Sequence, residues 1–383
     1  MDAVGARFVL ATIYPLCAAG ATRACLGRRL PAIDRTFPGV SLAWIRPRRL
    51  RPDRQDSTKE RFPLRLIRKI WEKIWWVSFP FFEKFGIHVL PVHYYSPLPD
   101  TRELKAKKHL FDREHPMHGV DMREGEQWRL LETTLKPYEE EYEDAGKGFF
   151  GLDERKMPFF APFNALTLYA LIRHYRPKKM IEVGSGMSTR ISAAAFAANR
   201  REGKPGEFFA VEPYPSEDLR RGFDGLTQTI AKKVEEFPIS EFLSLGENDI
   251  LFIDSTHAVK IFGDVNYLYL SVLPQLKPGV IIHIHDIFFP RDYLPHHFFQ
   301  WGIKQIWQEQ YLLQAFLMFN KEFRVMLCSS YLHFKGLERL KGLFAWYHPN
   351  RCPSSFWMRR EANIATASPN AARFAALTEA HLP

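Results

Sequence analysis

The chain has 383 residues, of which 46% are hydrophobic and 25% are charged, so it can bury a large core and is neither disordered nor fibrous as a whole. Its net charge of +10 is confined to residues 1–76, which hold sixteen Lys and Arg against six Asp and Glu, while the other 307 residues carry 37 of each. A neutral body argues against a general nucleic-acid-binding protein. Four cysteines without a Cys-x-x-Cys pair favour a reducing compartment, and no apolar run reaches the roughly eighteen residues of a transmembrane helix.

The first 150 residues divide into two predicted regions. Residues 1–60 are rich in Arg and Pro and show no sustained period, which predicts a poorly ordered basic leader. Residues 61–150 are expected to form a helical and extended accessory region, which includes a basic amphipathic helix at 64–75. Such a helix can lie on an anionic membrane, or dock on the protein body or on a second subunit. Peripheral contact with the inner membrane face and a homo-oligomer therefore both stay open for a protein that we expect in the cytoplasm.

From residue 179 onward, strand-like and helix-like stretches alternate, which is typical of a parallel α/β sheet. We therefore expect a Rossmann-like, doubly wound, mostly parallel sheet in a domain that spans 151–340, followed by a loose tail over 341–383. The strands are predicted at 180–183, 208–211, 227–231, 250–253, 280–284 and 323–328.

A glycine-rich turn between the first strand and a helix is the strongest local motif. Glu182 stands near the end of the strand, and the turn and helix start carry Gly184, Ser185, Gly186 and Ser188. Glycines let a ligand approach the backbone, while the free N–H groups of the helix start face that ligand. The Ser188 hydroxyl is expected to cap the helix. A carboxylate before the turn suits a cationic group, such as an amino-acid ammonium, better than a pyrophosphate.

Acids and histidines follow the other strands. Glu212 comes directly after the second strand, where a carboxylate can accept hydrogen bonds from both hydroxyls of a ribose. Asp254 and His257 follow the fourth strand, and His285 and Asp286 follow the fifth. Because the carboxyl ends of strands in an open α/β sheet line one crevice, these side chains should converge there. Such a cluster forms either a divalent-metal site or an acid/base apparatus.

In these motifs the chain resembles the class I S-adenosylmethionine-dependent methyltransferases over about 158–330. That family has an acid-x-Gly-x-Gly turn as its first motif and an acid after the next strand as its second. The resemblance implies that S-adenosylmethionine is the cofactor. The residues that it implies for cofactor binding are Glu182, Gly184, Ser185, Gly186, Ser188, Glu212 and Asp254.

The far strands resemble the cation-dependent O-methyltransferases and a methyltransferase-24-like group with Phe-Ile-Asp-Ser-x-His and His-x-His-Asp-Ile-Phe signatures. The resemblance puts Asp254, His285 and Asp286 in the places of the metal ligands, for Mg²⁺ or Mn²⁺, and His257 in that of the catalytic lysine. His285 stands where that group has an acid, which leaves a site without metal open. We expect Asp254, His257, His285 and Asp286 to act in catalysis, with His257, neutral near pH 7, as the base and His285 as its rival.

The reaction implied is methylation of a hydroxyl on a saccharide or secondary metabolite. N-methylation and a non-catalytic, membrane-associated module that binds S-adenosylmethionine or a nucleotide stay open. Residues 288–319 are rich in Phe, Tyr and Trp, which can either wall the acceptor site or pack the final helix against the sheet. The acceptor is a small molecule or saccharide in each enzymatic case, and no nucleic acid is expected.

Overall fold

The computed structural model describes residues 70, 73–74, 77–92, 94–149, 160–295 and 306–362. The chain divides into two compact units, Met1–Ile74 and Trp75–Pro383, and the description below concerns the second. The predicted leader at 1–60 lies outside the described residues, as does nearly all of the predicted helix at 64–75. Within the described ranges, no helix combines the length and the apolar character needed to cross a membrane.

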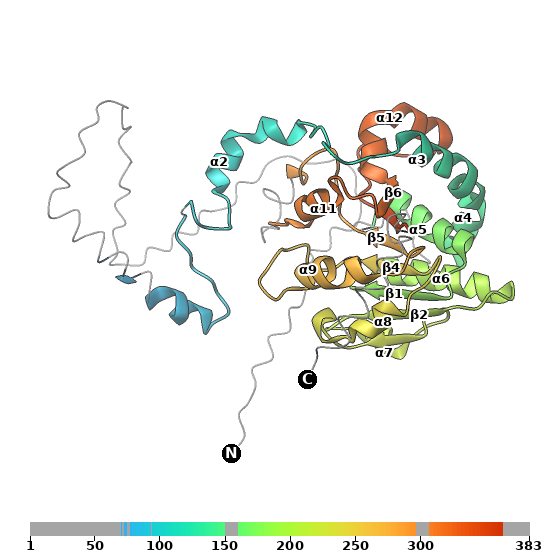
Figure 1. Cartoon of the computed structure of the whole chain (residues 1–383), viewed down its shortest axis with the longest axis horizontal. Helices are drawn as coiled ribbons and strands as arrows, with labels where there is room; N and C mark the ends of the chain where they lie inside the picture. The colour runs from blue at the N-terminus through green and yellow to red at the C-terminus, as the bar shows by residue number, and fades with distance from the viewer. Residues whose placement is uncertain are drawn as a thin grey trace, which may run out of the picture. The chain divides into compact units, whose positions relative to one another are not determined.

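A seven-stranded sheet forms the centre of the second unit (Figure 1). Its strands are β1 (Lys179–Val183), β2 (Glu207–Val211), β3 (Gln228–Ile230), β4 (Ile250–Ile253), β5 (Ile281–Ile284), β6 (Phe323–Cys328) and β7 (Phe356–Arg360). The spatial order is β3-β2-β1-β4-β5-β7-β6, in which neighbours from β3 to β5 are parallel and β7 is antiparallel to both β5 and β6. The order reverses between β1 and β4, which is where an open α/β sheet places its ligand crevice. The predicted Rossmann-like, mostly parallel sheet is confirmed.

The strand β7 corrects the expectation of a loose tail over 341–383. Phe356, Trp357 and Met358 are fully buried between β5 and β6. Three consecutive apolar residues show no alternation, because a strand inside a sheet that is covered on both faces buries every side chain. Residues 363–383 lie outside the described part of the chain.

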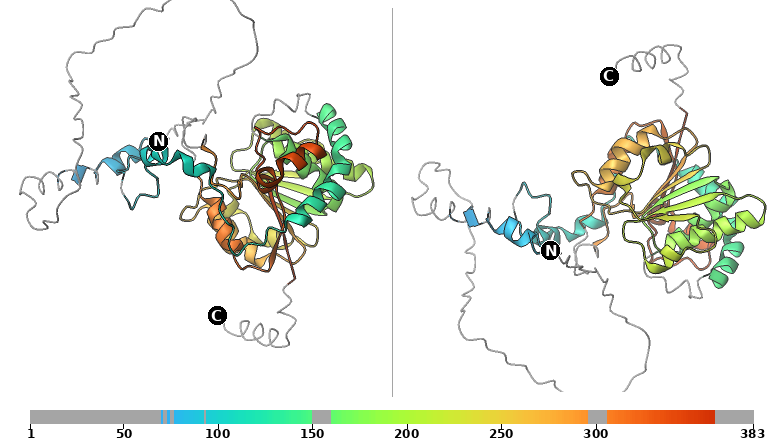
Figure 2. Two further views of the ribbon diagram at one scale, coloured as in Figure 1. Left: turned by 90° about the horizontal axis from the view of Figure 1, so that it is seen from above. Right: turned by 90° about the horizontal axis from the view of Figure 1, so that it is seen from below.

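Helices cover both faces of the sheet, as the view from below in Figure 2 shows. On one face, α5 (Pro162–Tyr175) and α6 (Met187–Arg201) pack on strand residues such as Met180, Ile250 and Phe252. On the other face, α9 (Asp264–Tyr267) and α11 (Glu309–Leu317) pack on the alternate residues, such as Ile181 and Leu251. The strands therefore bury both of their faces, which accounts for their continuous apolar runs.

The remaining elements connect or extend these layers. They are α2 (Thr101–Ala106), η1 (Lys108–Asp112), α3 (Glu124–Leu130), η2 (Leu131–Leu135), η3 (Lys136–Tyr138), α4 (Glu139–Phe149), α7 (Glu217–Arg221), η5 (Val234–Glu236), α8 (Ile239–Leu243), η6 (Leu268–Val272), η7 (Leu273–Gln275) and α12 (Ser329–Leu343).

Helices from the predicted accessory region belong to the same core as the sheet. Trp128 of α3 and both Leu131 and Leu135 of η2 are buried in the hydrophobic cluster that contains α5 and α6. The buried Gln127 side chain donates to the carbonyl of Met122 and accepts from the backbone N–H of Cys328, which fastens α3 to the end of β6. The domain boundary at 151 stays a prediction, but the packing crosses it.

Candidate active site

Gly184 occupies a position that only glycine can fill. Its φ is +91°, in the region that favours glycine, and its N–H donates to the Val211 carbonyl at the end of β2 over 3.0 Å. A Cβ on this residue would stand 2.0 Å from the carbonyl oxygen of Asp254, at the end of β4. The turn therefore holds the ends of β1, β2 and β4 against one another without a side chain between them.

The start of α6 corrects one prediction. The hydroxyl that receives the free N–H of Gly186 belongs to Thr189, at 2.9 Å. Ser188, the predicted cap, instead donates from its hydroxyl to Oε1 of Glu182 over 2.5 Å. Thr189 stands three positions after Gly186, which is the reach of one helical turn, whereas the Ser188 side chain lies on the sheet side of the helix.

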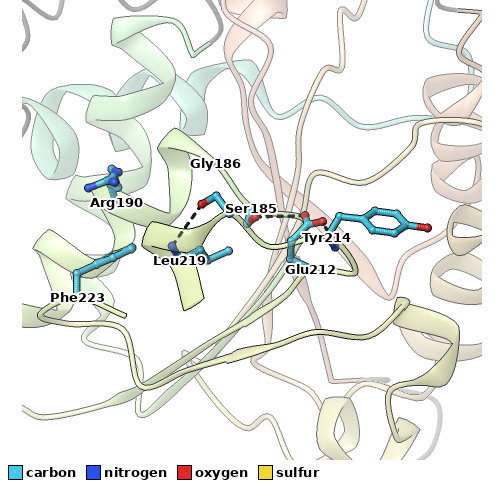
Figure 3. A pocket seen from close by; sticks show the side chains of 8 residues that line it. Ser185, Gly186, Arg190, Glu212, Tyr214, Leu219 and Phe223 are labelled. Atoms are coloured by element: carbon cyan, nitrogen blue, oxygen red, sulfur yellow. Dashed lines mark hydrogen bonds between the residues drawn. The ribbon is translucent and has the colours of Figure 1, made fainter. Parts of the chain in front are cut away.

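Glu212 forms one wall of a pocket at the end of β2. Its Oε2 accepts from the Ser185 hydroxyl at 3.2 Å, and its Oε1 accepts from the backbone N–H of Tyr214 at 2.8 Å (Figure 3). The pocket has a volume of about 350 Å³ and is lined by Ser185, Gly186, Arg190, Glu212, Tyr214, Ser216, Leu219 and Phe223. This volume lies at the lower end of the range for small-molecule sites, and the pocket opens next to the glycine turn.

The acids and histidines of the far strands meet as predicted. Nε2 of His257 lies 3.3 Å from Oδ1 of Asp254 and 3.8 Å from Oδ2 of Asp286. Nε2 of His285 lies 3.6 Å from Oδ1 of Asp286. His257 and Asp286 both have positive φ, 56° and 54°, a strained backbone that is common at functional sites.

Glu309, at the start of α11, is a site residue that sequence reasoning missed. Its Oε2 lies 2.7 Å from Nδ1 of His257, and the side chain is fully buried. The backbone N–H groups of Gln308 and Glu309 also donate to the His257 carbonyl, at 2.9 and 3.2 Å. The sequence gives little sign of this role, because Glu309 is a single acid inside the aromatic stretch 288–319 and does not follow a strand.

Comparison with known proteins identifies this arrangement. Residues 181–287 match a family model that is described as a methyltransferase domain, and this segment contains the glycine turn, Glu212 and the acid–histidine cluster. The chain belongs to the class I S-adenosylmethionine-dependent methyltransferases.

The methyltransferase is also similar to individual proteins. An uncharacterised protein of Archaeoglobus fulgidus is 32% identical over 171 residues, which are 42% of this chain and 75% of that protein. The methyltransferase PaMTH1 of Podospora anserina, in a structure with bound S-adenosylhomocysteine, is 16% identical, with 71% and 100% of the two chains covered and a TM-score of 0.34. The O-methyltransferase TomG of Streptomyces achromogenes is 12% identical, with 60% and 91% covered and a TM-score of 0.33. TM-scores of this size carry no inference about the acceptor of this methyltransferase.

Two features of the methyltransferase fit its cofactor. Glu182 is fully buried, and its Oε2 is a buried oxygen without a hydrogen-bond partner among the described residues. Burial raises the pKa of Glu182 to about 8, against the hydrogen bonds from Ser188 and Thr189, which lower it. The orphaned oxygen and the pocket beside Glu212 are the two places where a bound cofactor would complete the hydrogen bonding.

The surroundings of His257 shift its pKa away from the usual value of a histidine. Burial lowers its pKa, but the hydrogen bonds to Asp254 and Glu309 and the charge of Asp286 outweigh burial and raise the pKa well above 6.5. Burial also acts to raise the pKa of Asp254, yet the neighbouring His285 and His257 bring it below its usual value. The three neighbouring carboxyl groups therefore favour the protonated form of His257.

His285, the rival base, is held by aromatic packing. Its ring stacks on Phe160 with centroids 4.7 Å apart, and the residue is only 3% exposed. His283, which is fully buried, stacks on Phe252 and its Nε2 lies 3.2 Å from the Ser355 hydroxyl, so its contacts are those of a structural residue. Phe288, Phe289 and Tyr293 are likewise buried, so this part of the aromatic stretch packs rather than lining the crevice.

The residues named as tentative metal ligands, Asp254, His285 and Asp286, do not fit a metal ion. Among the described residues, no group of three or more His, Cys, Asp or Glu side chains is arranged to hold one. The space between Asp254 and Asp286 is occupied by the ring of His257. The acid and base chemistry of the cluster therefore rests on its own side chains.

Proposed function

We propose that this methyltransferase transfers its methyl group to a hydroxyl oxygen, and that His257 accepts the hydroxyl proton. The observation that carries the proposal is the imidazole of His257, which Glu309 holds at Nδ1 and whose Nε2 faces the strand ends beside the glycine turn. A hydroxyl must lose its proton as the methyl arrives, so a positioned base is the group that O-methylation requires. S-adenosylmethionine supplies a methyl group on a positively charged sulfur.

In the proposed step, the neutral form of His257 takes the acceptor proton on Nε2 while the hydroxyl oxygen bonds to the methyl carbon. The bond from carbon to sulfur breaks, and its electron pair stays on sulfur. Glu309 fixes the ring through the Nδ1–H bond, and Asp254 and Asp286 stabilise the imidazolium that forms. The proton then leaves to solvent, and the crevice side of Asp254, whose side chain is 30% exposed, offers an exit.

A neutral acceptor agrees with the charges at the site better than an amine does. Asp254 and Asp286 are the groups that would bind an ammonium, yet both already face the Nε2 of His257. Trp307 lies beside the proposed base, with its ring centroid 4.7 Å from that of His257. Because an indole stacks on both sugar faces and aryl rings, we propose a saccharide or an aromatic secondary metabolite as the acceptor.

A methyl-transfer screen tests this function. The full chain is incubated with methyl-labelled S-adenosylmethionine and pairs of acceptors that differ only in a hydroxyl or an amine, drawn from sugars, glycosides and phenols. We expect label in hydroxyl compounds and less than about a hundredth as much in the matched amines, because a site built for one group discriminates strongly against the other. Label in the amines alone would contradict O-methylation.

A further inference from the structure

We infer that the imidazole of His257 takes the place of a divalent cation between Asp254 and Asp286, so that methyl transfer at this site needs no metal ion. The inference rests on the proposed role of His257 as the base. In the cation-dependent enzymes a metal ion lies between carboxylates of this kind. Here we assign that position between Asp254 and Asp286 to the His257 side chain.

The contacts of His257 fix it in that position from both sides. Its Nε2 reaches Asp254 at 3.3 Å and Asp286 at 3.8 Å, while its Nδ1 reaches the fully buried Glu309 at 2.7 Å. The carbonyl of His257 accepts two backbone N–H groups from Gln308 and Glu309, so the whole residue is tied to the start of α11. Only 4% of its surface is exposed.

The carboxylate of Asp286 has a neighbour at each oxygen. Its Oδ1 accepts from the Ser354 hydroxyl at 2.9 Å, and its Oδ2 faces His257. Ser354 is itself held by Asn164, which donates to the Ser354 hydroxyl at 3.3 Å and accepts its backbone N–H at 3.1 Å. A cation shared by Asp254 and Asp286 must therefore displace the His257 ring, because Mg²⁺ and Mn²⁺ require oxygen ligands within about 2.2 Å in a nearly octahedral arrangement.

His285, the third predicted metal ligand, does not complete a metal site. His285 points its Nε2 toward Oδ1 of Asp286 at 3.6 Å, and its ring is stacked on Phe160. This stack holds the ring of His285, and among the described residues no three His, Cys, Asp or Glu side chains are arranged to hold a metal ion. The ring of His257 therefore fills the position that a shared metal ion would need, and His285 supplies no replacement ligand.

Removal of the His257 ring should create the metal site that the ring now fills. Free Mn²⁺ is measured by electron paramagnetic resonance in titrations of the EDTA-treated full chain, with S-adenosylhomocysteine present. We expect the wild type to bind Mn²⁺ no tighter than millimolar and His257→Ala to bind it at least tenfold tighter. The gain should vanish in the double variant Asp254→Asn/His257→Ala. His348→Ala, which removes an exposed histidine outside the cluster, should behave as the wild type.

Three results would overturn the inference. They are micromolar Mn²⁺ binding by the wild type that Asp254→Asn abolishes, the lack of any gain in His257→Ala, and a gain that persists in the double variant. Binding of S-adenosylhomocysteine by calorimetry and thermal unfolding are recorded for each variant, so a misfolded protein is recognised. Because Mn²⁺ binding is read without an acceptor, failure of the proposed O-methylation leaves this result interpretable, and failure of the metal inference leaves methyl transfer to be tested separately.

Discussion

His257→Ala is expected to lower the rate of methyl transfer at saturating S-adenosylmethionine by about 10²–10⁴-fold, the usual contribution of a general base. The Nε2 atom that takes the acceptor proton is lost, while the glycine turn and the Glu212 pocket lie on other strands and keep their contacts. Cofactor affinity should therefore change by less than about threefold, since each of these contacts is unaltered. Single-turnover rates and calorimetric titration measure the two quantities.

The role of His257 as the base also predicts how the rate of methyl transfer changes with pH. Only the neutral imidazole can accept a proton, and the surrounding carboxylates raise the His257 pKa well above 6.5. The rate in the wild type should rise with pH through and above neutrality, and the residual rate of His257→Ala should lack this rise. His348→Ala serves as the control for loss of a histidine. A His257→Ala rate within threefold of the wild type would remove the base assignment.

Of the two glycine-to-alanine substitutions in the turn at 184–186, Gly184→Ala is expected to lower stability and cofactor binding more. The added Cβ would meet the Asp254 carbonyl oxygen at 2.0 Å, and φ of +91° is strained for any other residue. Because the clash is with backbone of the neighbouring strand, the turn must move. We expect a loss of about 2–5 kcal/mol in the free energy of unfolding and at least tenfold weaker cofactor binding.

A second glycine with positive φ serves as a control that separates the effect of backbone strain from that of the steric clash. Gly203 has a similar φ of +74°, but a Cβ there meets nothing within 4 Å. Gly203→Ala should therefore cost about 1–2 kcal/mol, the strain alone, and leave cofactor binding unchanged. Urea unfolding of both variants gives the comparison. Equal losses in the two variants would show that the close approach of Gly184 to Asp254 does not matter.

The parts of the site that could be predicted are those in which strand ends carry the chemistry. Glu182, Gly184 and Glu212 follow from a local pattern, because a parallel sheet brings successive strand ends to one edge. Asp254 and Asp286 converge for the same reason. Local pattern could not assign the hydroxyls of the turn, since Ser188 and Thr189 both stand near the helix start and the sheet selects which of them turns inward.

The parts that could not be predicted depend on contacts between distant segments. Glu309 reaches His257 across 52 residues of sequence, and nothing near Glu309 distinguishes it from a surface acid. β7 is the last strand in the sequence but lies between β5 and β6 in the sheet. Its run of three apolar residues is too short to predict a strand from the sequence. The raised pKa of His257 likewise depends on three carboxyl groups on three separate segments, which the sequence around His257 does not show.

The central claim is that S-adenosylmethionine binds at the ends of β1 and β2, and one calorimetric experiment tests it most directly. S-adenosylmethionine is titrated into the full chain, into Glu212→Ala, and into Glu217→Ala, which removes an equal charge from a side chain that is 85% exposed on the nearby α7. We predict micromolar binding to the wild type and to Glu217→Ala. Glu212→Ala should bind about 10- to 100-fold more weakly, because charge-assisted hydrogen bonds to the ribose contribute about 1.5–3 kcal/mol. Absence of binding to the wild type, or equal affinity in all three proteins, would contradict the account.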